Sequence, residues 1–194
     1  MKQTTKRNPE ITAEFVIELY RQYGSENYIG EPVSQLEHMC QSAELAEKEG
    51  YDEEVILGAF FHDIGHLCEH ITDTKQMDGY GVVDHEKMGA DFLRSKGFSE
   101  TIASLVENHV QAKRYLTYRY PEYYDQLSPA SKKTLEFQGG VMTAAEAEAF
   151  EVNPLLALHI QVRRWDDAAK LTAQPLPSLE KYRVMMVHHL EAQI

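Results

Sequence analysis

Four histidines and two aspartates of this chain have the residue types and spacing of a metal site. His62 and Asp63 are adjacent in an apolar stretch, and four partners lie at wide intervals around them. Imidazole and carboxylate together are the ligands that iron, manganese and similar divalent ions take in proteins. We therefore predict a metal site built from six residues: His38, His62, Asp63, His85, His109 and Asp166.

The adjacency of His62 and Asp63 favours two metal ions over one. Neighbouring residues on a helix diverge by roughly 100°, because one turn takes about 3.6 residues. The two side chains therefore cannot both point straight at one ion without strain. A carboxylate has two oxygens, however, so Asp63 can bridge two ions while His62 serves one. Six ligand residues for two ions leave positions for substrate and water, which a catalytic site needs.

Three further side chains that can donate hydrogen bonds lie one helical turn from predicted ligands. His66 and Lys113 each follow a ligand histidine by four residues, and Arg163 precedes Asp166 by three. Residues three or four apart share a helix face, so these donors point toward the same centre as the ligands. Ser131, close to a helix start, adds a hydroxyl. Imidazole, ammonium and guanidinium beside two metals predict a site for a phosphate or phosphonate group.

The elements that must position these residues are nearly all helices, because β-branched alternation is scarce and apolar residues recur at helical spacing. We expect one all-α domain over 1–194, with roughly residues 1–10 frayed and a loop over 73–81. Helix starts are indicated at Pro32, Asp52, Ser99, Ser128-Pro129, Thr143 (a capping box with Glu146), Pro154 and Pro177.

Charge and composition limit the partners and the compartment. The net charge of −12 argues against a nucleic-acid surface, which is normally basic. The chain has no apolar stretch that could span a bilayer and no apolar block behind its basic start, so we expect a soluble, cytoplasmic protein that binds no membrane. Cys40 and Cys68 are too few for a disulfide framework and are expected to be free thiols. The sequence leaves the oligomeric state undetermined.

Five segments that contain these residues resemble a known family, the HD-domain mixed-valent diiron oxygenases that cleave organophosphonates. The resemblance covers roughly residues 28–170 and implies a single HD-domain helical bundle around a dinuclear metal site. The segments are Tyr28-Ile-Gly-Glu31, Gln35-Leu-Glu-His38, His62-Asp-Ile-Gly-His66, Glu107-Asn-His-Val-Gln-Ala-Lys113-Arg-Tyr and Leu127-Ser-Pro-Ala-Ser131.

The resemblance also implies cofactors and roles. Two iron ions, in a mixed-valent Fe(II)/Fe(III) state, would act with O2 as co-substrate. Tyr28 and Glu31 would be catalytic and substrate-binding: the tyrosine takes an iron position while the site is empty, and the glutamate faces the substrate's cationic end. A carboxylate beside an aromatic ring suits an ammonium by charge and cation–π attraction. One iron would be held by His38, His62, Asp63 and Asp166, the other by Asp63, His85 and His109, and the phosphonate by His66, Lys113, Ser131 and Arg163.

The implied reaction is O2-dependent cleavage of the C–P bond of a small 1-hydroxyphosphonate with a cationic end. The substrate is either 1-hydroxy-2-(trimethylammonio)ethylphosphonate, giving glycine betaine and phosphate, or 2-amino-1-hydroxyethylphosphonate, giving glycine and phosphate. Departures from the family pattern at 23–27 and 69–83, with Pro32 and the extra aromatics Tyr23 and Tyr80, border the cationic end and leave this choice open. Extra tyrosines favour a quaternary ammonium.

Two other functions remain open at this stage. A metal-dependent HD phosphohydrolase acting on a nucleotide or other phosphate ester would use the His62-Asp63 doublet equally well, although it does not require all six ligands. A catalytically silent signalling module is disfavoured by the intact ligand set and anion site. The remaining histidines lack a comparable context and are expected to be structural or exposed: His70, His159, His188 and His189.

Overall fold

The computed structural model describes residues 8–28, 30–72, 77 and 83–194, and these residues confirm the all-α prediction. Within the described ranges, the only β-type pairing is an isolated bridge between Asn27 and Ser34. The helices are α1 (Pro9–Tyr23), α2 (Gln35–Lys48), α3 (Glu53–Phe61), α4 (Ile64–Cys68), α5 (His85–Lys96), α6 (Glu100–Arg119), α7 (Pro121–Gln126), α8 (Pro129–Phe137), α9 (Ala144–Glu151), α10 (Leu156–Ala168) and α11 (Leu179–Ala192).

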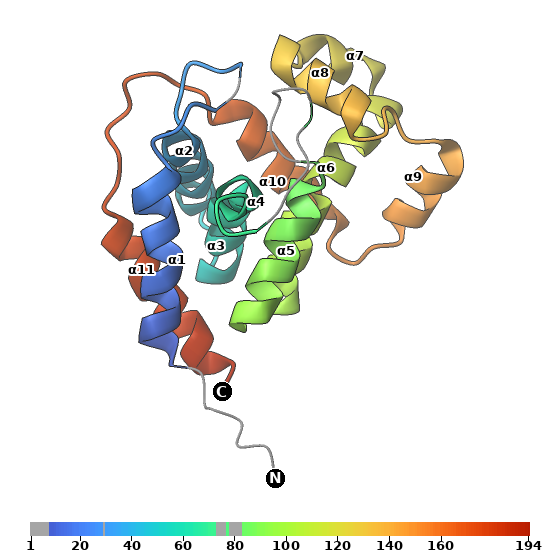
Figure 1. Ribbon diagram of the computed structural model, residues 1–194. Helices are drawn as coiled ribbons and strands as arrows, with labels where there is room; N and C mark the ends of the chain where they lie inside the picture. The colour runs from blue at the N-terminus through green and yellow to red at the C-terminus, as the bar shows by residue number, and fades with distance from the viewer. Residues whose placement is uncertain (1–7, 29, 73–76, 78–82) are drawn as a thin grey trace.

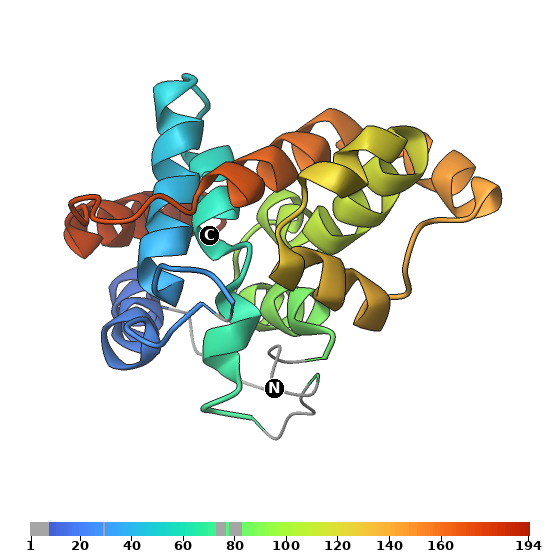
Figure 2. The ribbon, with the colours of Figure 1, turned by 90° about the horizontal axis from the view of Figure 1, so that it is seen from above.

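Helices α3 and α6 lie at the centre of the bundle (Figure 1). Helix α3 contacts α2, α6, α10 and α11, and α6 contacts α3, α5, α7, α9 and α10. After Glu53 and Glu54 in its first turn, α3 is apolar on all sides, and Leu57, Phe60 and Phe61 are fully buried. Seen from above, α9 and α11 lie at opposite sides of the molecule (Figure 2). The centre of the bundle is thus formed by α3 and α6, which are not consecutive in the chain.

Side chains that cap the helix ends explain where most helices begin. Asp52, Ser99 and Ser128 each accept a hydrogen bond from the backbone N–H three residues on, as expected from the sequence. The predicted capping box of Thr143 and Glu146 has both of its reciprocal bonds. These starts are decided by contacts within four residues, which is why the sequence alone predicts them.

Helix α2 begins later than predicted. Pro32 was expected in its first turn, but the helix starts at Gln35, with Ser34 as the N-cap in a capping box with Glu37. The preceding residues form a turn instead, because the backbone N–H of Tyr28 donates to Val33 O at 2.9 Å. This turn carries both Tyr28 and Glu31 to the side of the bundle where the site lies.

The first helix begins within the segment that was expected to be frayed. Asn8 caps α1 through Ile11 N, and Pro9 is its first residue. Ala13, Val16 and Tyr20 are fully buried against the core, where α1 packs on α11. Residues 1–7, and most of the predicted loop 73–81, lie outside the described residues.

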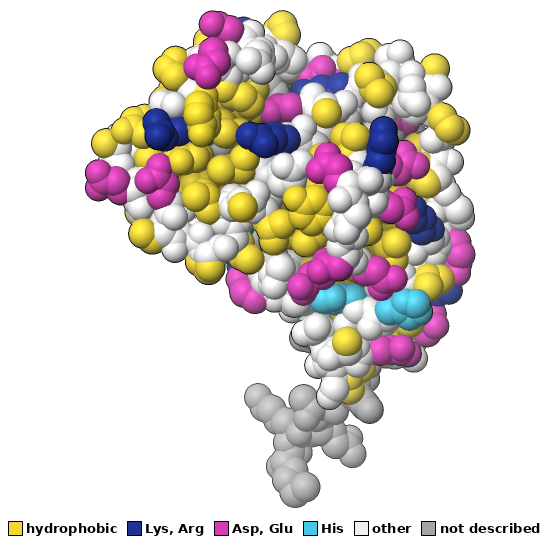
Figure 3. All heavy atoms as spheres, turned by 180° about the vertical axis from the view of Figure 1, so that it is seen from behind, with side chains coloured by type: hydrophobic (Ala, Val, Ile, Leu, Met, Phe, Trp, Pro, Cys, Tyr) yellow, Lys and Arg dark blue, Asp and Glu magenta, His cyan; other side chains and the backbone are white. Residues whose placement is uncertain are grey.

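The surface agrees with the acidic composition. Acidic side chains are spread over the face shown in Figure 3, where apolar side chains gather on the upper part around single basic residues. Cys40 and Cys68 are buried free thiols, as predicted. In the described part of the chain, no helix has both the length and the apolar character needed to cross a membrane.

Candidate metal centre and anion pocket

The His62-Asp63 doublet lies at a break between two helices. Helix α3 ends at Phe61 and α4 begins at Ile64. Asp63 has φ −106° and ψ 13°, in the sparsely populated region between helix and strand that is common at functional sites. The sequence analysis placed the doublet inside a continuous helix, and this was wrong. His62 keeps helical dihedral angles and the backbone departs from the helix at Asp63, and both side chains reach the same centre.

Gly65 allows the helix that follows the doublet to approach α5 closely. A Cβ atom at Gly65 would lie 1.9 Å from the carbonyl oxygen of His85, so even alanine would force the two helices apart. His85 is the first residue of α5 and follows Asp84, which has a positive φ of 57°. Gly65 thus explains how a histidine from beyond the 69–83 segment comes to lie beside Asp63.

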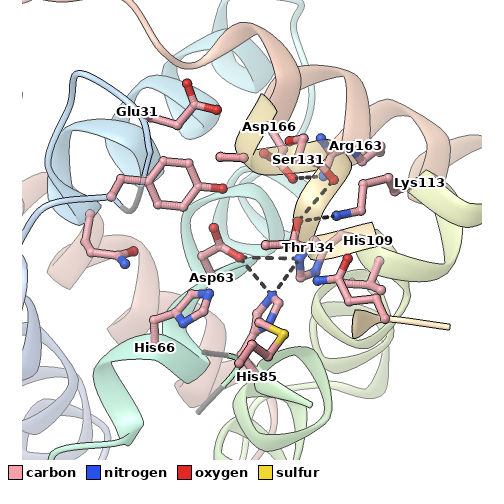
Figure 4. Close-up of a pocket in the computed structure, with 16 residues that line it drawn as sticks. Glu31, Asp63, His66, His85, His109, Lys113, Ser131, Thr134, Arg163 and Asp166 are labelled. Carbon is pink, nitrogen blue, oxygen red and sulfur yellow. Dashed lines mark hydrogen bonds and ion pairs between the residues drawn. The ribbon is translucent and has the colours of Figure 1, made fainter. Parts of the chain in front are cut away.

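All six predicted metal ligands meet in the interior, in two groups of three. The ligand atoms of each group lie within 4.8 Å of one another, and all six residues are buried. Asp63 joins the groups, because its two oxygens face different histidines. Figure 4 shows the side of Asp63 that faces His85 and His109. Asp63 Oδ1 lies 3.2 Å from His85 Nε2 and 3.3 Å from His109 Nε2. Its Oδ2 lies 3.5 Å from His38 Nε2 and 3.4 Å from His62 Nε2.

Backbone carbonyls orient three of the four imidazoles. The Nδ1 atoms lie 2.9 Å from Ala169 O for His38, 2.8 Å from Ala59 O for His62 and 2.7 Å from Val106 O for His109. A carbonyl only accepts hydrogen bonds, so each Nδ1 carries the proton and each Nε2 presents a lone pair to the centre. The Nε2 atoms of His38 and His62 are 3.0 Å apart. Two lone pairs at that distance need a cation between them.

The donor set fits two divalent ions. Asp63 Oδ2 and Asp166 Oδ1 are buried and have no hydrogen-bond partner among the described residues. Two ligand atoms at right angles on one ion, with bonds of about 2.1 Å, lie roughly 3.0 Å apart. The distances between the donor atoms, from 3.0 Å to 3.5 Å, agree with this spacing. Ions at these two positions would satisfy both orphaned oxygens.

The charges of the centre favour cations. Burial by itself would raise the pKa of Asp63, but His62, His109 and His38 hold it well below its usual range. Burial would lower the pKa of His38, yet its contacts with Asp166 and Asp63 raise it to about 9. Without a metal ion, the two ionised carboxylates favour a proton on His38 Nε2, the position that a divalent ion would take. Divalent ions would supply the same positive charge and more.

A cavity of about 50 Å³ opens onto one half of this centre. His85, His109 and Asp63 line it together with Asp166 of the other group, whereas His38 and His62 are not among its described lining residues. Every residue predicted to bind substrate also lines the cavity: Tyr28, Glu31, His66, Lys113, Ser131 and Arg163.

Lys113 is a buried cation without a carboxylate in hydrogen-bonding contact among the described residues. The side chain is 2% exposed, and its Nζ donates to Thr134 Oγ1 at 3.0 Å. Burial, and then the charge of Arg163, lower its pKa to about 7. Thr134 in turn donates to Ser131 O at 3.2 Å. An anion in the cavity would supply the missing partner of Lys113.

Thr134 is a site residue that the sequence analysis missed. It follows Ser131 by three residues on α8 and lines the same cavity. The helical spacing that identified His66 and Lys113 would have found it, had it been applied to Ser131.

Arg163 has a second role that its sequence position did not indicate. Its Nη1 donates to Asp166 Oδ2 at 2.5 Å, its Nε donates to Tyr123 Oη at 3.0 Å, and its Nη2 pairs with Asp167. These bonds use three of its five N–H groups. Arg163 therefore orients the ligand Asp166 as well as lining the cavity. Asp167, the neighbour that could have been mistaken for the ligand, lies on the outer side of the guanidinium.

Tyr28 and Glu31 line the end of the pocket that lies away from Lys113. The Tyr28 ring stacks on His38 with centroids 4.0 Å apart, and burial together with Asp63 and Asp166 raises the pKa of its hydroxyl. Gly30 has a φ of 77°, and a Cβ there would lie 2.6 Å from the Cβ of Ala130, so this glycine lets the turn pack on α8. Glu31 accepts hydrogen bonds from Ser128 Oγ at 2.5 Å and Lys170 Nζ at 2.8 Å.

The other histidines are structural or exposed, as expected. His159 is fully buried, and its Nε2 lies 3.1 Å from Ser104 Oγ. His70 stacks on Tyr23 with centroids 3.9 Å apart. His189 accepts a hydrogen bond from Ser99 N, and His188 is largely exposed. Tyr80, the other extra aromatic, lies outside the described residues.

Comparison with known proteins gives one family match and three similar proteins. The HD domain model matches residues 35–136, and the chain belongs to the HD-domain family. An uncharacterised protein of Acanthamoeba polyphaga mimivirus is 45% identical over 175 residues, which is 90% of this chain and 80% of the relative. A [1-hydroxy-2-(trimethylamino)ethyl]phosphonate dioxygenase (glycine-betaine-forming) of Leisingera caerulea is 40% identical over 94% of this chain and 92% of its own. A hydroxymethylphosphonate dioxygenase of Gimesia maris is 36% identical over 91% of this chain and 87% of its own.

Proposed function

We propose that this protein is a phosphonate oxygenase that uses two iron ions and O2 to cleave the C–P bond of a 1-hydroxyphosphonate. The observation that carries the proposal is the position of the Asp63 carboxylate between two groups of buried ligands. A cavity that also contains Lys113 and Arg163 opens beside His85 and His109. Two relatives named as phosphonate dioxygenases, each aligned over more than nine-tenths of this chain, favour an oxygenase over the HD phosphohydrolase.

The reaction balances without a further reductant. One O2 is consumed for each substrate, C1 is oxidised from the alcohol to the carboxylate, the C–P bond breaks, and phosphorus leaves as phosphate with release of one proton. The iron ions, when bound, would supply O2 activation and polarise the C1 hydroxyl.

The side chains of this protein would bind and orient the substrate. We assign the phosphonate oxygens to His66, Lys113 and Ser131, with Arg163 neutralising charge behind them. Lys113 would bind as the ammonium, because the anion removes the unfavourable isolation of a buried charge. Burial lowers the pKa of His66 to about 3, so it would act as a neutral imidazole. Tyr28 covers the His38 side of the centre and would exclude water there.

The group attached to C1 distinguishes the candidate substrates. The sequence favours the trimethylammonio or the primary-amine compound, which would form glycine betaine or glycine. The relative from Gimesia maris is named for hydroxymethylphosphonate, which carries no such group. All three share the 1-hydroxyphosphonate unit that the metals and the anion pocket would hold.

The experiment is to measure O2 uptake and phosphate release by iron-reconstituted protein supplied with each 1-hydroxyphosphonate. Bis(p-nitrophenyl) phosphate, with iron or manganese, serves as the hydrolase control. We expect phosphate release to match O2 uptake one to one. Ester hydrolysis without any O2 consumption would instead establish an HD phosphohydrolase and overturn the proposal.

A further inference from the structure

The ammonium of Lys170 already holds the contacts that a cationic substrate would need. Its Nζ donates to Glu31 Oε1 at 2.8 Å and lies 5.9 Å from the centre of the Tyr28 ring. A carboxylate and an aromatic ring are the two groups that attract an ammonium most strongly in a protein site. Glu31 and Tyr28 both line the cavity. In this chain, therefore, a side chain of the protein occupies the place expected for the substrate's cation.

The backbone on both sides of Lys170 is fixed to α2. The carbonyl of Ala169 lies 2.9 Å from His38 Nδ1. The backbone N–H of Leu171 donates to Gln41 Oε1 at 3.0 Å, and Gln41 Nε2 donates to Leu171 O at 2.9 Å. Lys170 thus extends from a held segment, unlike a lysine on a free surface loop. Lys170 therefore loses less conformational entropy when it binds Glu31 than a lysine on a free loop would.

The Lys170–Glu31 pair is shielded from solvent. The two side chains are 15% and 9% exposed, and Ser128 Oγ adds a third polar group on the same carboxylate oxygen. A substrate ammonium could take Glu31 only by displacing Lys170 and leaving its charge without a partner in a largely dry position. Breaking such a pair is far more costly than breaking an exposed one.

From these contacts we infer that Lys170 is a specificity-determining residue that makes the pocket select a 1-hydroxyphosphonate whose substituent on C1 is uncharged. This inference rests on the proposed C–P cleavage and names its substrate class. Lys170 supplies the cation that Glu31 binds, so the pocket presents a neutral end to the substrate.

The first test compares turnover by wild type and Lys170→Met, which keeps the length of the side chain and removes its charge. We would measure kcat/KM for hydroxymethylphosphonate, 2-amino-1-hydroxyethylphosphonate and its trimethylammonio analogue. Wild type should prefer the uncharged substrate by about tenfold or more, and the variant should shift this ratio toward the primary amine by about tenfold or more. Lys181→Met, which removes an outer lysine paired with Glu47, is the matched control and should leave the ratio unchanged.

The second test measures binding without turnover. Calorimetry would compare 2-aminoethylphosphonate with ethylphosphonate, which differ in the ammonium group and lack the C1 hydroxyl. Lys170→Met should raise the relative affinity for the amine, and Lys170→Gln should reproduce the shift if the first variant folds poorly. Metal content and circular dichroism verify that each variant is intact.

The outcomes separate the inference from the proposed function. Preference of wild type for a cationic ligand, or an unchanged ratio in intact Lys170→Met, would overturn the role of Lys170 while C–P cleavage stands. Absence of O2 uptake with every 1-hydroxyphosphonate would refute the proposed function, and the binding ratio would still decide whether Lys170 controls charge selection.

Discussion

The two halves of the metal centre differ in how firmly they are built. The inner half comprises His38, His62 and Asp166 with Asp63 Oδ2, and the outer half comprises His85 and His109 with Asp63 Oδ1. Both inner imidazoles are fixed by backbone carbonyls, and Arg163 holds Asp166. In the outer half, His85 Nδ1 has no hydrogen bond among the described residues, and its nearest carboxylate is Glu86 at 3.5 Å.

Solvent access follows the same division. Both outer histidines line the cavity, whereas the inner half reaches it only through Asp166, and Tyr28 stacks over the inner His38. A metal centre that must bind substrate needs open coordination positions on one ion and can enclose the other. The difference between the halves therefore suggests that the inner ion is held for its charge and redox role, and that the outer ion meets the substrate. Four predictions test this division.

The largest effect is expected from Asp63→Asn, because Asp63 alone belongs to both halves. The amide keeps the shape but loses the charge, so both ions should bind more than roughly 100-fold less tightly; even residues that only orient ligands contribute 10–100-fold. Metal content after dialysis measures this. Asp91→Asn, an exposed aspartate paired with Lys87, is the control. Retention of one ion at full stoichiometry would contradict the bridging role.

Removing one histidine from each half should separate the two ions. His62→Ala should lose the inner ion and retain the outer one, and His109→Ala should do the reverse. Because the cavity lies on the outer side, His109→Ala should also weaken binding of inorganic phosphate by about tenfold, since a direct metal contact to the anion is lost. Metal analysis and calorimetry measure both effects. Equal losses of both ions in both variants would mean that the halves are not independent.

Lys113→Met should leave both ions in place and weaken anion binding by roughly 10–100-fold, the range for a hydrogen bond to a charged group. The effect should depend on pH. The pKa of Lys113 is lowered to about 7 by burial first and by Arg163 second, so the unliganded side chain loses its proton as the pH rises through that value. An anion needs the protonated form, and its affinity should therefore fall above about pH 7.

Sulfate is the suitable probe for this pH dependence, because its own charge is constant between pH 5 and pH 9. Its dissociation constant should rise by up to tenfold per pH unit above the midpoint in wild type. The slope should disappear in Lys113→Met. Bound metal ions add positive charge and would move the midpoint to lower pH. A slope that persists in the variant would assign the proton to another group.

The smallest effect is expected from Thr134→Val, which removes the hydroxyl that accepts from Lys113 and keeps the side chain's shape. Lys113 would lose one neutral partner, worth about 0.5–1.5 kcal/mol, so phosphate affinity should change by a factor of about 2–12. Metal content should be unaffected. A loss as large as that of Lys113→Met would place Thr134 in direct contact with the anion.

The sequence predicted most of the site because metal ligation restricts the residue types. All six proposed ligands and all six proposed substrate residues converge on one cavity or its floor. Helical spacing was sufficient for His66 and Lys113, which lie on the same helix faces as their neighbouring ligands. It also placed Arg163 beside Asp166 on α10, but it could not indicate the bond from Arg163 to Tyr123, which joins α10 to α7.

Helix starts that are set by a nearby capping side chain were also largely predicted from the sequence. Caps at Asp52, Ser99 and Ser128 were predicted because the side chain and the N–H that it binds are three residues apart. The start of α2 was misplaced because Pro32 was taken as its first turn, although the capping box of Ser34 and Glu37 is a local signal of the same kind. The break at Asp63 was missed because no glycine or proline marks it, and the packing of Gly65 on α5 accompanies it.

The sequence by itself thus determined an all-α chain and most of its helix caps, and it predicted the six metal-site residues that the structure brings together, since these follow from residue chemistry and contacts within a turn. Only the tertiary structure decided that the backbone breaks between α3 and α4 at the His62-Asp63 doublet. It alone placed Lys170 on Glu31, 139 residues away in sequence. Such contacts arise where packed helices bring distant backbone segments together, and no spacing along the chain encodes them directly.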